Sequence, residues 1–243
     1  MTIPISADTP AEAELSRRIQ RTEAEEVVAR LAGAVTERQL IAVAENAAGF
    51  AKEATARHLH PESPPVACKA GCSWCCYQLV PVSVPETLQI AAFLQDLPTA
   101  EADGIKVRLR MLDRATRGIT PKQRVGVPKP CAFLQDGRCA IYAVRPLACA
   151  EFTSYDLRVC KKGQRKGFKP DSVIHEKARM LVYYAVQRGL TEGLKTAAPL
   201  ADCSALELTA ALVVALDSPD GAALWANGQE VFRQARLHLD KGN

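Results

Sequence analysis

Cysteine is the residue type whose spacing in this sequence could do chemistry, because eight of the nine cysteines lie between positions 68 and 160 of the 243 residues. The eight are Cys68, Cys72, Cys75, Cys76, Cys131, Cys139, Cys149 and Cys160. A structural cysteine behaves as a small hydrophobic residue and occurs singly, whereas thiols two or three residues apart match the reach of ligands around one soft metal ion. The pattern predicts a metal or iron–sulfur centre.

Eight thiolates suit two four-thiolate zinc sites, one polynuclear cluster such as a 4Fe-4S centre with spare thiols, or one four-cysteine site beside redox thiols. The side chains of Cys75 and Cys76 diverge, so these neighbours fit ligands of different metals, or one ligand and one bystander. Thiolates are soft and no histidine or carboxylate has comparable spacing, which favours zinc or iron–sulfur over magnesium, calcium or manganese. The choice between zinc and an iron–sulfur cluster stays open.

The positive charge of the chain gathers on the same stretch. Residues 66–170 carry 17 basic and 8 acidic side chains, while the whole chain has a formal net charge of +4. A zinc ion with four thiolates has a charge of about −2, so nearby Lys and Arg would offset an anionic centre. The alternative is a nucleic-acid-binding run over 158–169, which the low aromatic content of 5% disfavours because few residues could stack on bases.

The N-terminal residues 1–10 lack a basic start followed by an apolar run, so they do not resemble a secretory signal. The most apolar run, Ala210 to Leu216, is far shorter than the roughly 18 residues of a membrane span. We therefore expect a cytoplasmic protein without membrane contact, in which thiols stay reduced. Clustered cysteines bind metal more often than they form disulfides in that compartment.

The elements that must position the cysteines are expected to be mainly α-helical, with helices bracketing a cysteine-rich middle. Capping boxes at Thr36 with Gln39 and at Ser83 with Glu86 mark two helix starts. The helices are expected over 11–31, 36–60, 83–97, 99–117, 172–188, 204–216 and 219–239. Residues 118–130, with three prolines, are expected to be a loop, and the basic run after Cys160 is expected to be exposed. We expect three segments, 1–65, 66–170 and 171–243, within one compact domain.

One short β-hairpin is expected inside the cysteine-rich middle. Asp136-Gly137 supplies the positive φ angles of a two-residue turn, so the flanking residues should pair and bring Cys131 and Cys139 to the same small element. Cys203 lies away from the other eight and is expected to be a packing or surface thiol. Arg145 could donate hydrogen bonds to metal-bound sulfur, or form an ordinary surface salt bridge.

The combined motif resembles a known family. Its parts are Cys-x3-Cys-x2-Cys-Cys at 68–76, Pro130-Cys131-Ala-Phe-Leu, Cys139-Ala-Ile-Tyr, Arg145-Pro146-x2-Cys149 and Cys160. This order resembles the cysteine-cluster family of zinc- or iron-chelating domains, which includes small bacterial proteins and the cysteine region of flagellin lysine N-methylases. The likeness covers roughly residues 66–160. It implies that the eight cysteines are the ligands and leaves the metal open.

Two enzymatic alternatives remain beside a metal carrier, sensor or structural centre. Cys68-x3-Cys72-Ser-Trp74-Cys75 has the three-cysteine spacing of radical S-adenosylmethionine enzymes, but no alternation of strands and helices follows it. Protein methylation, as in the flagellin methylases, would need a cofactor region, and no glycine-rich cofactor loop is recognisable. The sequence identifies no substrate and leaves open whether the protein is an enzyme. Metal ions are the expected partners, and a protein partner is compatible with the sequence.

Overall fold

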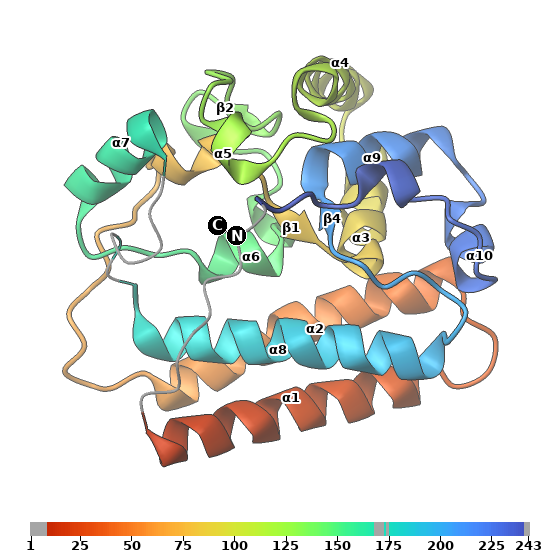
Figure 1. Cartoon of the computed structure of the whole chain (residues 1–243), viewed down its shortest axis with the longest axis horizontal. Helices are drawn as coiled ribbons and strands as arrows, with labels where there is room; N and C mark the ends of the chain where they lie inside the picture. Colours follow the sequence, from red (N-terminus) through yellow and green to blue (C-terminus); the bar gives the residue numbers. More distant parts are fainter. Residues whose placement is uncertain (1–8, 168–172, 174, 241–243) are drawn as a thin grey trace.

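Three long helices form one layer of the molecule: α1 (Pro10–Arg30), α2 (Glu37–His58) and α8 (Lys177–Ala197) (Figure 1). The computed structural model of the chain describes residues 9–167, 173 and 175–240. Capping boxes at Thr9 with Glu12 and at Thr36 with Gln39 start α1 and α2, because each side chain satisfies a backbone N–H that the first helical turn leaves free. The mainly α fold with a short hairpin is therefore confirmed.

Two glycines of α8 allow α1 and α8 to approach closely. A Cβ atom at Gly189 would meet the carbonyl oxygen of Gln20, and one at Gly193 would lie 2.6 Å from the Cβ of Val27. The sequence predicted a helix over 172–188 that ends at Gly189. Position 172 lies outside the described residues, and α8 continues through Gly189 to Ala197. The prediction was wrong at this end because glycine here serves helix packing rather than helix termination.

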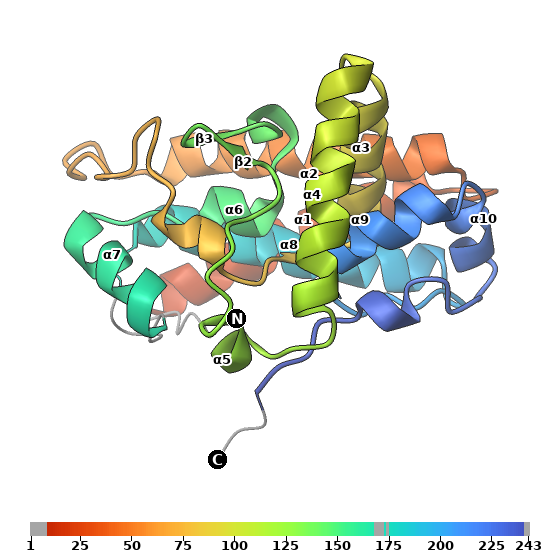
Figure 2. The same cartoon turned by 90° about the horizontal axis from the view of Figure 1, so that it is seen from above.

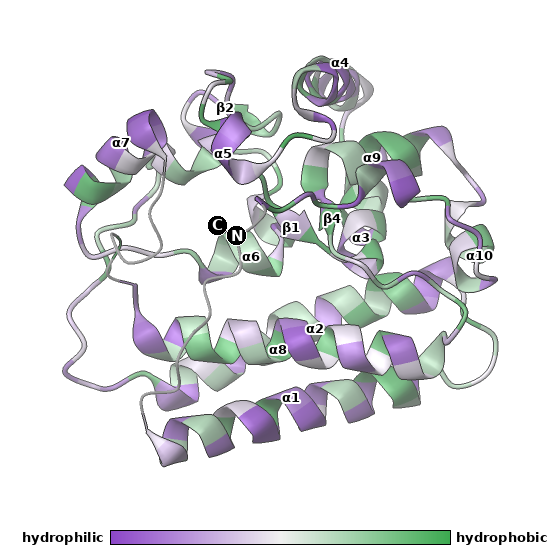
Figure 3. Cartoon of the chain, viewed as in Figure 1, coloured by the Kyte–Doolittle hydropathy of each residue, from purple (hydrophilic) through white to green (hydrophobic). Residues whose placement is uncertain are grey.

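A second layer contains α3 (Val84–Gln95), α4 (Thr99–Thr116) and α9 (Leu208–Asp217), and the view from above shows α4 on its outer side (Figure 2). Hydrophobic residues dominate α9 (Figure 3), and Leu208, Ala211 and Leu212 are buried. A helix that is apolar on most of its surface must be enclosed, so α9 packs between α3 and α4. This helix contributes buried residues to the hydrophobic core between α3 and α4.

The C-terminal part differs from the predicted pattern of two helices. The expected helix over 204–216 begins at Leu208, because Leu206–Glu207 forms β4, which pairs antiparallel with β1 (Pro81–Val82). The expected helix over 219–239 is limited to α10 (Gly221–Ala226) and the 3₁₀ helix η4 (Arg233–Ala235). Gly228 with a φ of +83° follows α10, and that left-handed conformation ends the helix.

Short elements carry the cysteine-rich middle. They are η1 (Trp74–Tyr77), α5 (Pro121–Arg124), β2 (Leu134–Gln135), β3 (Arg138–Cys139), η2 (Tyr142–Val144), α6 (Leu147–Glu151) and α7 (Leu157–Lys166). Asp136 and Gly137 have φ angles of 50° and 75°, so they form the predicted turn between β2 and β3. Residues 118–130, expected to be a loop, include the short helix α5 behind a capping box of Thr120 with Gln123.

The basic run after Cys160 was expected to be exposed, and the Lys and Arg side chains of its described part are exposed. Residues 157–166 form α7, whose first turn is capped by the Asp156 carboxylate accepting a hydrogen bond from the Arg158 N–H over 2.8 Å. Lys169 lies outside the described residues. Charged side chains on one face and buried Cys160 and Gly163 on the other give α7 the two-sided pattern of a helix lying on a surface. Within 9–167, 173 and 175–240, no helix is long and apolar enough to cross a bilayer.

Candidate metal centre

The first cysteine cluster lies on a loop and the 3₁₀ helix η1. The Ala67 N–H donates to the carbonyl oxygen of Ser154 over 2.8 Å, and the Cys72 N–H donates to that of Lys69 over 2.9 Å. Gly71 adopts a φ of +85°, which a residue with a Cβ rarely takes, so glycine allows the chain to turn between Cys68 and Cys72. Cys75 and Cys76 follow on η1 as neighbouring residues.

The β2–β3 hairpin brings the second pair of cysteines to the first cluster. The Cys131 N–H donates a hydrogen bond to the carbonyl oxygen of Cys76 over 2.7 Å. The turn at Gly137 approaches Gly71, since a Cβ atom placed on Gly137 would lie 3.8 Å from the Gly71 carbonyl oxygen. Cys139 lies in β3, where it pairs with Leu134. Cys131 and Cys139 therefore share one small element that contacts the first cluster at two points.

Two further helices supply Cys149 and Cys160. Glu86, in the capping box of α3, also accepts a hydrogen bond from the Leu147 N–H over 2.8 Å, so one buried carboxylate holds the first turn of α6 and places Cys149. Cys160 lies on the buried face of α7. That helix contacts η1, where the Lys161 ammonium lies 5.6 Å from the centre of the Trp74 ring. Elements from four parts of the chain thus converge.

Cys75 acts electrostatically on thiols from every part of this assembly. Burial raises the pKa of Cys68, Cys139, Cys149 and Cys160, and a negative charge on Cys75 raises the pKa of each further. An anion disfavours a second anion only when the two lie near each other in a poorly solvated region. Cys75 therefore occupies a central position among the thiols.

The other electrostatic couplings divide the thiols into two groups. Burial raises the pKa of Cys68, and its contact with the Ser154 backbone lowers it. Negative charge on Cys72, Cys75 or Cys160 raises the pKa of Cys68 further. Beyond burial and its contact with Cys75, the pKa of Cys76 is raised by Cys131 and Cys149. Burial and then the charge of Cys131 raise the pKa of Cys149, and Cys139 adds to the effect. These couplings link Cys68, Cys72 and Cys160 in one group and Cys76, Cys131, Cys139 and Cys149 in another, with Cys75 coupled to both.

The thiols of Cys75 and Cys76 influence each other and have opposite acidities. The neighbouring Cys76 thiol lowers the pKa of Cys75 to about 7, although burial opposes the change, whereas Cys75 and burial raise the pKa of Cys76 strongly. Arg145 lowers the pKa of Cys75 as well. Cys75 is therefore the thiol of the pair that ionises first.

Arg145 lies beside three of the thiols. Its guanidinium carbon is 4.3 Å from the centre of the Tyr142 ring, and its positive charge lowers the pKa of Cys75, Cys139 and Cys149 against the raising effect of burial on each. A cation in this position favours thiolates over thiols. Hydrogen bonding of Arg145 to metal-bound sulfur stays a prediction.

Sequence reasoning missed Arg124. This arginine is 2% exposed, and its guanidinium donates to the carbonyl oxygens of Val127 and Lys129 over 2.5 and 2.6 Å. Burial lowers its pKa, while Glu207, Cys131 and Tyr77 counteract that effect. Arg124 therefore orders the turn that leads into Cys131 and places a buried cation near its thiol. The capping box at Thr120 was the available signal, since it indicates a helix that turns Arg124 inward.

The thiols are close enough to influence one another but are not arranged as ligands. Among the described residues, no three His, Cys, Asp or Glu side chains are gathered tightly enough to hold a metal ion. All nine cysteines are free, Cys160 is buried and the other eight are half-buried. The donors fit a soft metal in number and chemistry, and χ1 rotation of half-buried thiols is the movement that would gather them.

Cys203 lies outside this assembly. Its thiol donates a weak hydrogen bond to the Ala201 carbonyl oxygen at 3.6 Å. Burial raises the pKa of Cys203, Asp202 adds to the effect and Lys195 opposes it, so no other thiol is involved. The environment of the Cys203 thiol therefore differs from that of the eight clustered cysteines, whose pKa values involve other thiols.

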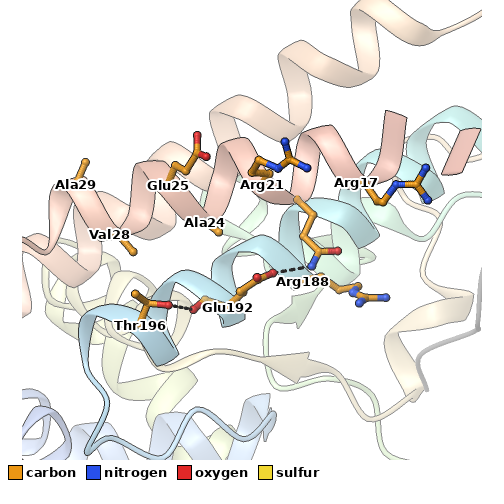
Figure 4. Close-up of a pocket in the computed structure, with 10 residues that line it drawn as sticks. Arg17, Arg21, Ala24, Glu25, Val28, Ala29, Arg188, Glu192 and Thr196 are labelled. Atoms are coloured by element: carbon orange, nitrogen blue, oxygen red, sulfur yellow. Dashed lines mark hydrogen bonds between the residues drawn. The ribbon is translucent and has the colours of Figure 1, made fainter. Parts of the chain in front are cut away.

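A separate groove of about 730 Å³ lies between α1 and α8 (Figure 4). Figure 4 shows Arg17, Arg21 and Glu25 on α1 facing away from α8, and a hydrogen bond of 2.6 Å that links Gln20 to Glu192 across the two helices. Its lining contains no cysteine. The groove is a solvent-filled furrow between paired helices and takes no part in the thiol assembly.

Comparison with known proteins agrees with this site. Residues 67–172 match a protein-family model described as "CxxCxxCC: Putative zinc- or iron-chelating domain". This match confirms the resemblance of that part of the chain to the cysteine-cluster family. No curated protein and no solved structure matches the chain. The relation to flagellin lysine N-methylases stays a prediction.

Proposed function

We propose that this protein binds zinc or iron through two four-thiolate groups that meet at η1. The first group is Cys68, Cys72, Cys75 and Cys160. The second group is Cys76, Cys131, Cys139 and Cys149. The observation that supports this division most directly is the set of couplings around the central pair, because the pKa of Cys68 and of Cys160 responds to Cys72, and the pKa of Cys76 responds to Cys131 and Cys149, while Cys75 influences thiols of both groups.

Consecutive side chains on a 3₁₀ helix point in different directions, so Cys75 and Cys76 suit two ions or two corners of one polynuclear cluster better than one mononuclear site. Arg124, Arg145 and Lys161 lie beside the thiols and would offset part of the negative charge of metal-bound thiolates. A bound metal would stabilise the thiolate forms, which the buried environment otherwise disfavours.

We further propose that the metal is exchangeable, as in a carrier or sensor, rather than purely structural. Cys68 and Cys72 of the first group are half-buried, so a partner or chelator can reach them. The helical layers have their own hydrophobic core of α2, α3, α8 and α9 residues, such as Leu40, Ile90, Val182 and Leu212. A fold that does not depend on the metal for its core can release the metal without unfolding.

The test is purification without air, followed by metal analysis and visible spectroscopy. Two zinc ions per chain in a colourless protein would fit two closed four-thiolate sites, and a brown air-sensitive protein with iron and sulfide would fit a cluster. Exchange is then measured by transfer of the metal to a chromophoric chelator, with circular dichroism recorded before and after. Loss of helix content together with the metal would contradict the exchangeable role, and a protein that binds neither metal would overturn the proposal.

A further inference from the structure

A groove of about 390 Å³ lies next to the cysteine assembly, between α5, α7 and the end of η1. Its lining includes the apolar or aromatic side chains of Tyr77, Leu79 and Val125 and the basic side chains of Lys122 and Lys166. The two walls touch at one end, where a Cβ atom on Gly167 would lie 3.2 Å from the Cγ2 of Val125. The groove thus combines an apolar floor with a cationic rim.

The cationic side chains of α5 and α7 near this groove form no ion pair within the described part of the chain. Lys122, Lys162, Arg165 and Lys166 are exposed, and none of them forms an ion pair or hydrogen bond from its side chain with another described residue. Two other cations of α7 differ. Arg158 pairs with Asp156 at 2.9 Å, and Lys161 lies over Trp74. The α7 cations without an ion-pair partner, Lys162, Arg165 and Lys166, therefore lie on one side of the helix.

One carboxylate of the chain already occupies an end of the groove. Asp240 lines it, and its Oδ2 accepts a hydrogen bond from the Lys122 N–H over 3.1 Å. An acidic residue from an extended segment therefore has a place against α5. Lys166 lines the same groove, and Lys162 lies one turn before it on α7, just outside the lining.

We propose that this groove, with the unpaired cations of α5 and α7, binds an acidic segment of a partner protein. Carboxylates of the segment pair with Lys122, Lys162 and Lys166, and an apolar side chain of the segment packs on Val125 and Leu79. Complementary charge accelerates and orients such an encounter, while a small apolar anchor gives it specificity. The partner would lie beside Tyr77 and Gln78, which directly follow Cys76.

A protein segment fits this surface better than a nucleic acid does. The ten residues of α7 are about 15 Å long, and their unpaired cations flank a groove instead of forming an extended track for phosphates. The indole of Trp74 is covered by Lys161 and not presented for base stacking. The inference goes beyond metal binding and does not depend on which metal the thiolates hold.

The experiment uses the full-length, metal-loaded protein and three fluorescein-labelled probes of equal charge. These are a peptide alternating glutamate with leucine, an all-glutamate peptide and a uridine oligonucleotide, followed by fluorescence anisotropy at several salt concentrations. The test variant is Lys122→Glu/Lys162→Glu/Lys166→Glu. The matched control reverses three exposed cations elsewhere, Lys52→Glu/Arg57→Glu/Arg114→Glu.

We expect the glutamate–leucine peptide to bind best, its affinity to fall with salt, and the test variant to bind it at least about tenfold more weakly than the control variant does. Metal content should be the same in all three proteins, so failure of this inference is separable from failure of metal binding. Equal weakening by both variants, equal binding of the all-glutamate peptide, tighter binding of the oligonucleotide, or no peptide binding would each overturn the docking site.

Discussion

The Cys131 N–H and the Cys76 carbonyl oxygen form a hydrogen bond of 2.7 Å that joins the two cysteine-bearing stretches through their backbones. The bond places a cysteine before the hairpin next to a cysteine of η1 without using either thiol. Both sulfurs therefore remain available as ligands while their backbones are fixed. Side-chain substitutions can then test ligation without removing this connection.

Serine at Cys72 or at Cys139 should each remove a ligand from one thiolate group. We expect each variant to lose metal and to melt at a lower temperature, because a metal bound by folded protein stabilises it, by about 10 kcal/mol for structural zinc. Metal analysis and thermal melts of both variants measure the effect. Cys203→Ser is the control and should change neither property. Full metal loading with an unchanged melting temperature in Cys72→Ser and Cys139→Ser would show that neither is a ligand.

Arg124→Met should destabilise the turn before Cys131. The substitution leaves the carbonyl groups of Val127 and Lys129 without their donor and removes a buried cation beside the thiols. We expect a loss of about 1–3 kcal/mol in unfolding free energy and weaker metal binding. Chemical denaturation and competition with a chelator measure the two effects.

Arg124→Lys separates the two roles of this residue. It keeps the charge but cannot span two carbonyl groups as a guanidinium does. Metal affinity restored by Lys with stability still reduced would assign the affinity effect to charge. Arg114→Met on the exposed side of α4 is the control. Unchanged metal affinity in Arg124→Met would contradict a role of this residue in holding the second group.

Glu23 should make stability depend on pH. This residue is 1% exposed, neither carboxylate oxygen has a hydrogen-bond partner, and burial, with Glu26 adding and Arg30 opposing, raises its pKa to about 7. A raised pKa means that the stability associated with the neutral carboxyl is complete below about pH 4.5 and is lost as the pH rises through about 7. The charged form is then buried without compensation.

Glu23→Gln should therefore be more stable than the parent at pH 8 by about 2 kcal/mol and nearly equal to it at pH 4. Urea denaturation across this pH range measures the difference between the two proteins. The difference isolates Glu23, since burial raises the pKa of Glu151 to about 7 as well and affects both proteins alike. Glu25→Gln at an exposed position is the control, and a pH-independent difference for Glu23→Gln would refute the prediction.

Gly193→Ala should destabilise the protein by separating α1 from α8. Its new Cβ would lie within 2.6 Å of the Val27 Cβ, so the helices must shift at a cost of about 1–3 kcal/mol. Gly49→Ala is the opposite case, since Gly49 is an exposed position of α2 where a Cβ would meet nothing within 4 Å. We expect this substitution to raise the free energy of unfolding by about 0.5–1 kcal/mol. Equal effects of the two substitutions in thermal melts would exclude a packing role for Gly193.

Local signals predicted those parts of the fold that short-range interactions decide. The capping boxes at Thr36 and Ser83 begin α2 and α3, and Asp136-Gly137 forms the hairpin turn, because each depends on bonds between residues three or fewer positions apart. The end of α8 was predicted wrongly because Gly189 is used for packing on α1. The end of α10 was predicted wrongly because Gly228 adopts a left-handed conformation there, close to Leu200.

In the candidate site, too, residue type could be interpreted from the sequence, whereas features that depend on tertiary contacts could not. Cysteine spacing singled out eight thiols as candidate ligands, since ligand chemistry is visible in residue type, and their ligation stays a prediction. Arg124 was not predicted, because its role depends on burial and on two carbonyl groups that a later turn brings within reach. The β1–β4 pair joins residues 81–82 to 206–207, and two-residue strands have no periodicity that a sequence pattern can detect.

The contact between α1 and α8 has a consequence for how the thiols are retained. The cysteine segment leaves the helical layer after α2 and returns to it at α8, and α8 packs against both α1 and α2. The two ends of the segment are thus anchored on one body, like the ends of a closed loop. Helix packing compensates the entropy that the segment loses when its ends are held together. When a metal ion leaves, the thiols therefore stay confined near one another. Rebinding should then be rapid, limited by side-chain rotation and proton release rather than by a search of the chain for its ligands.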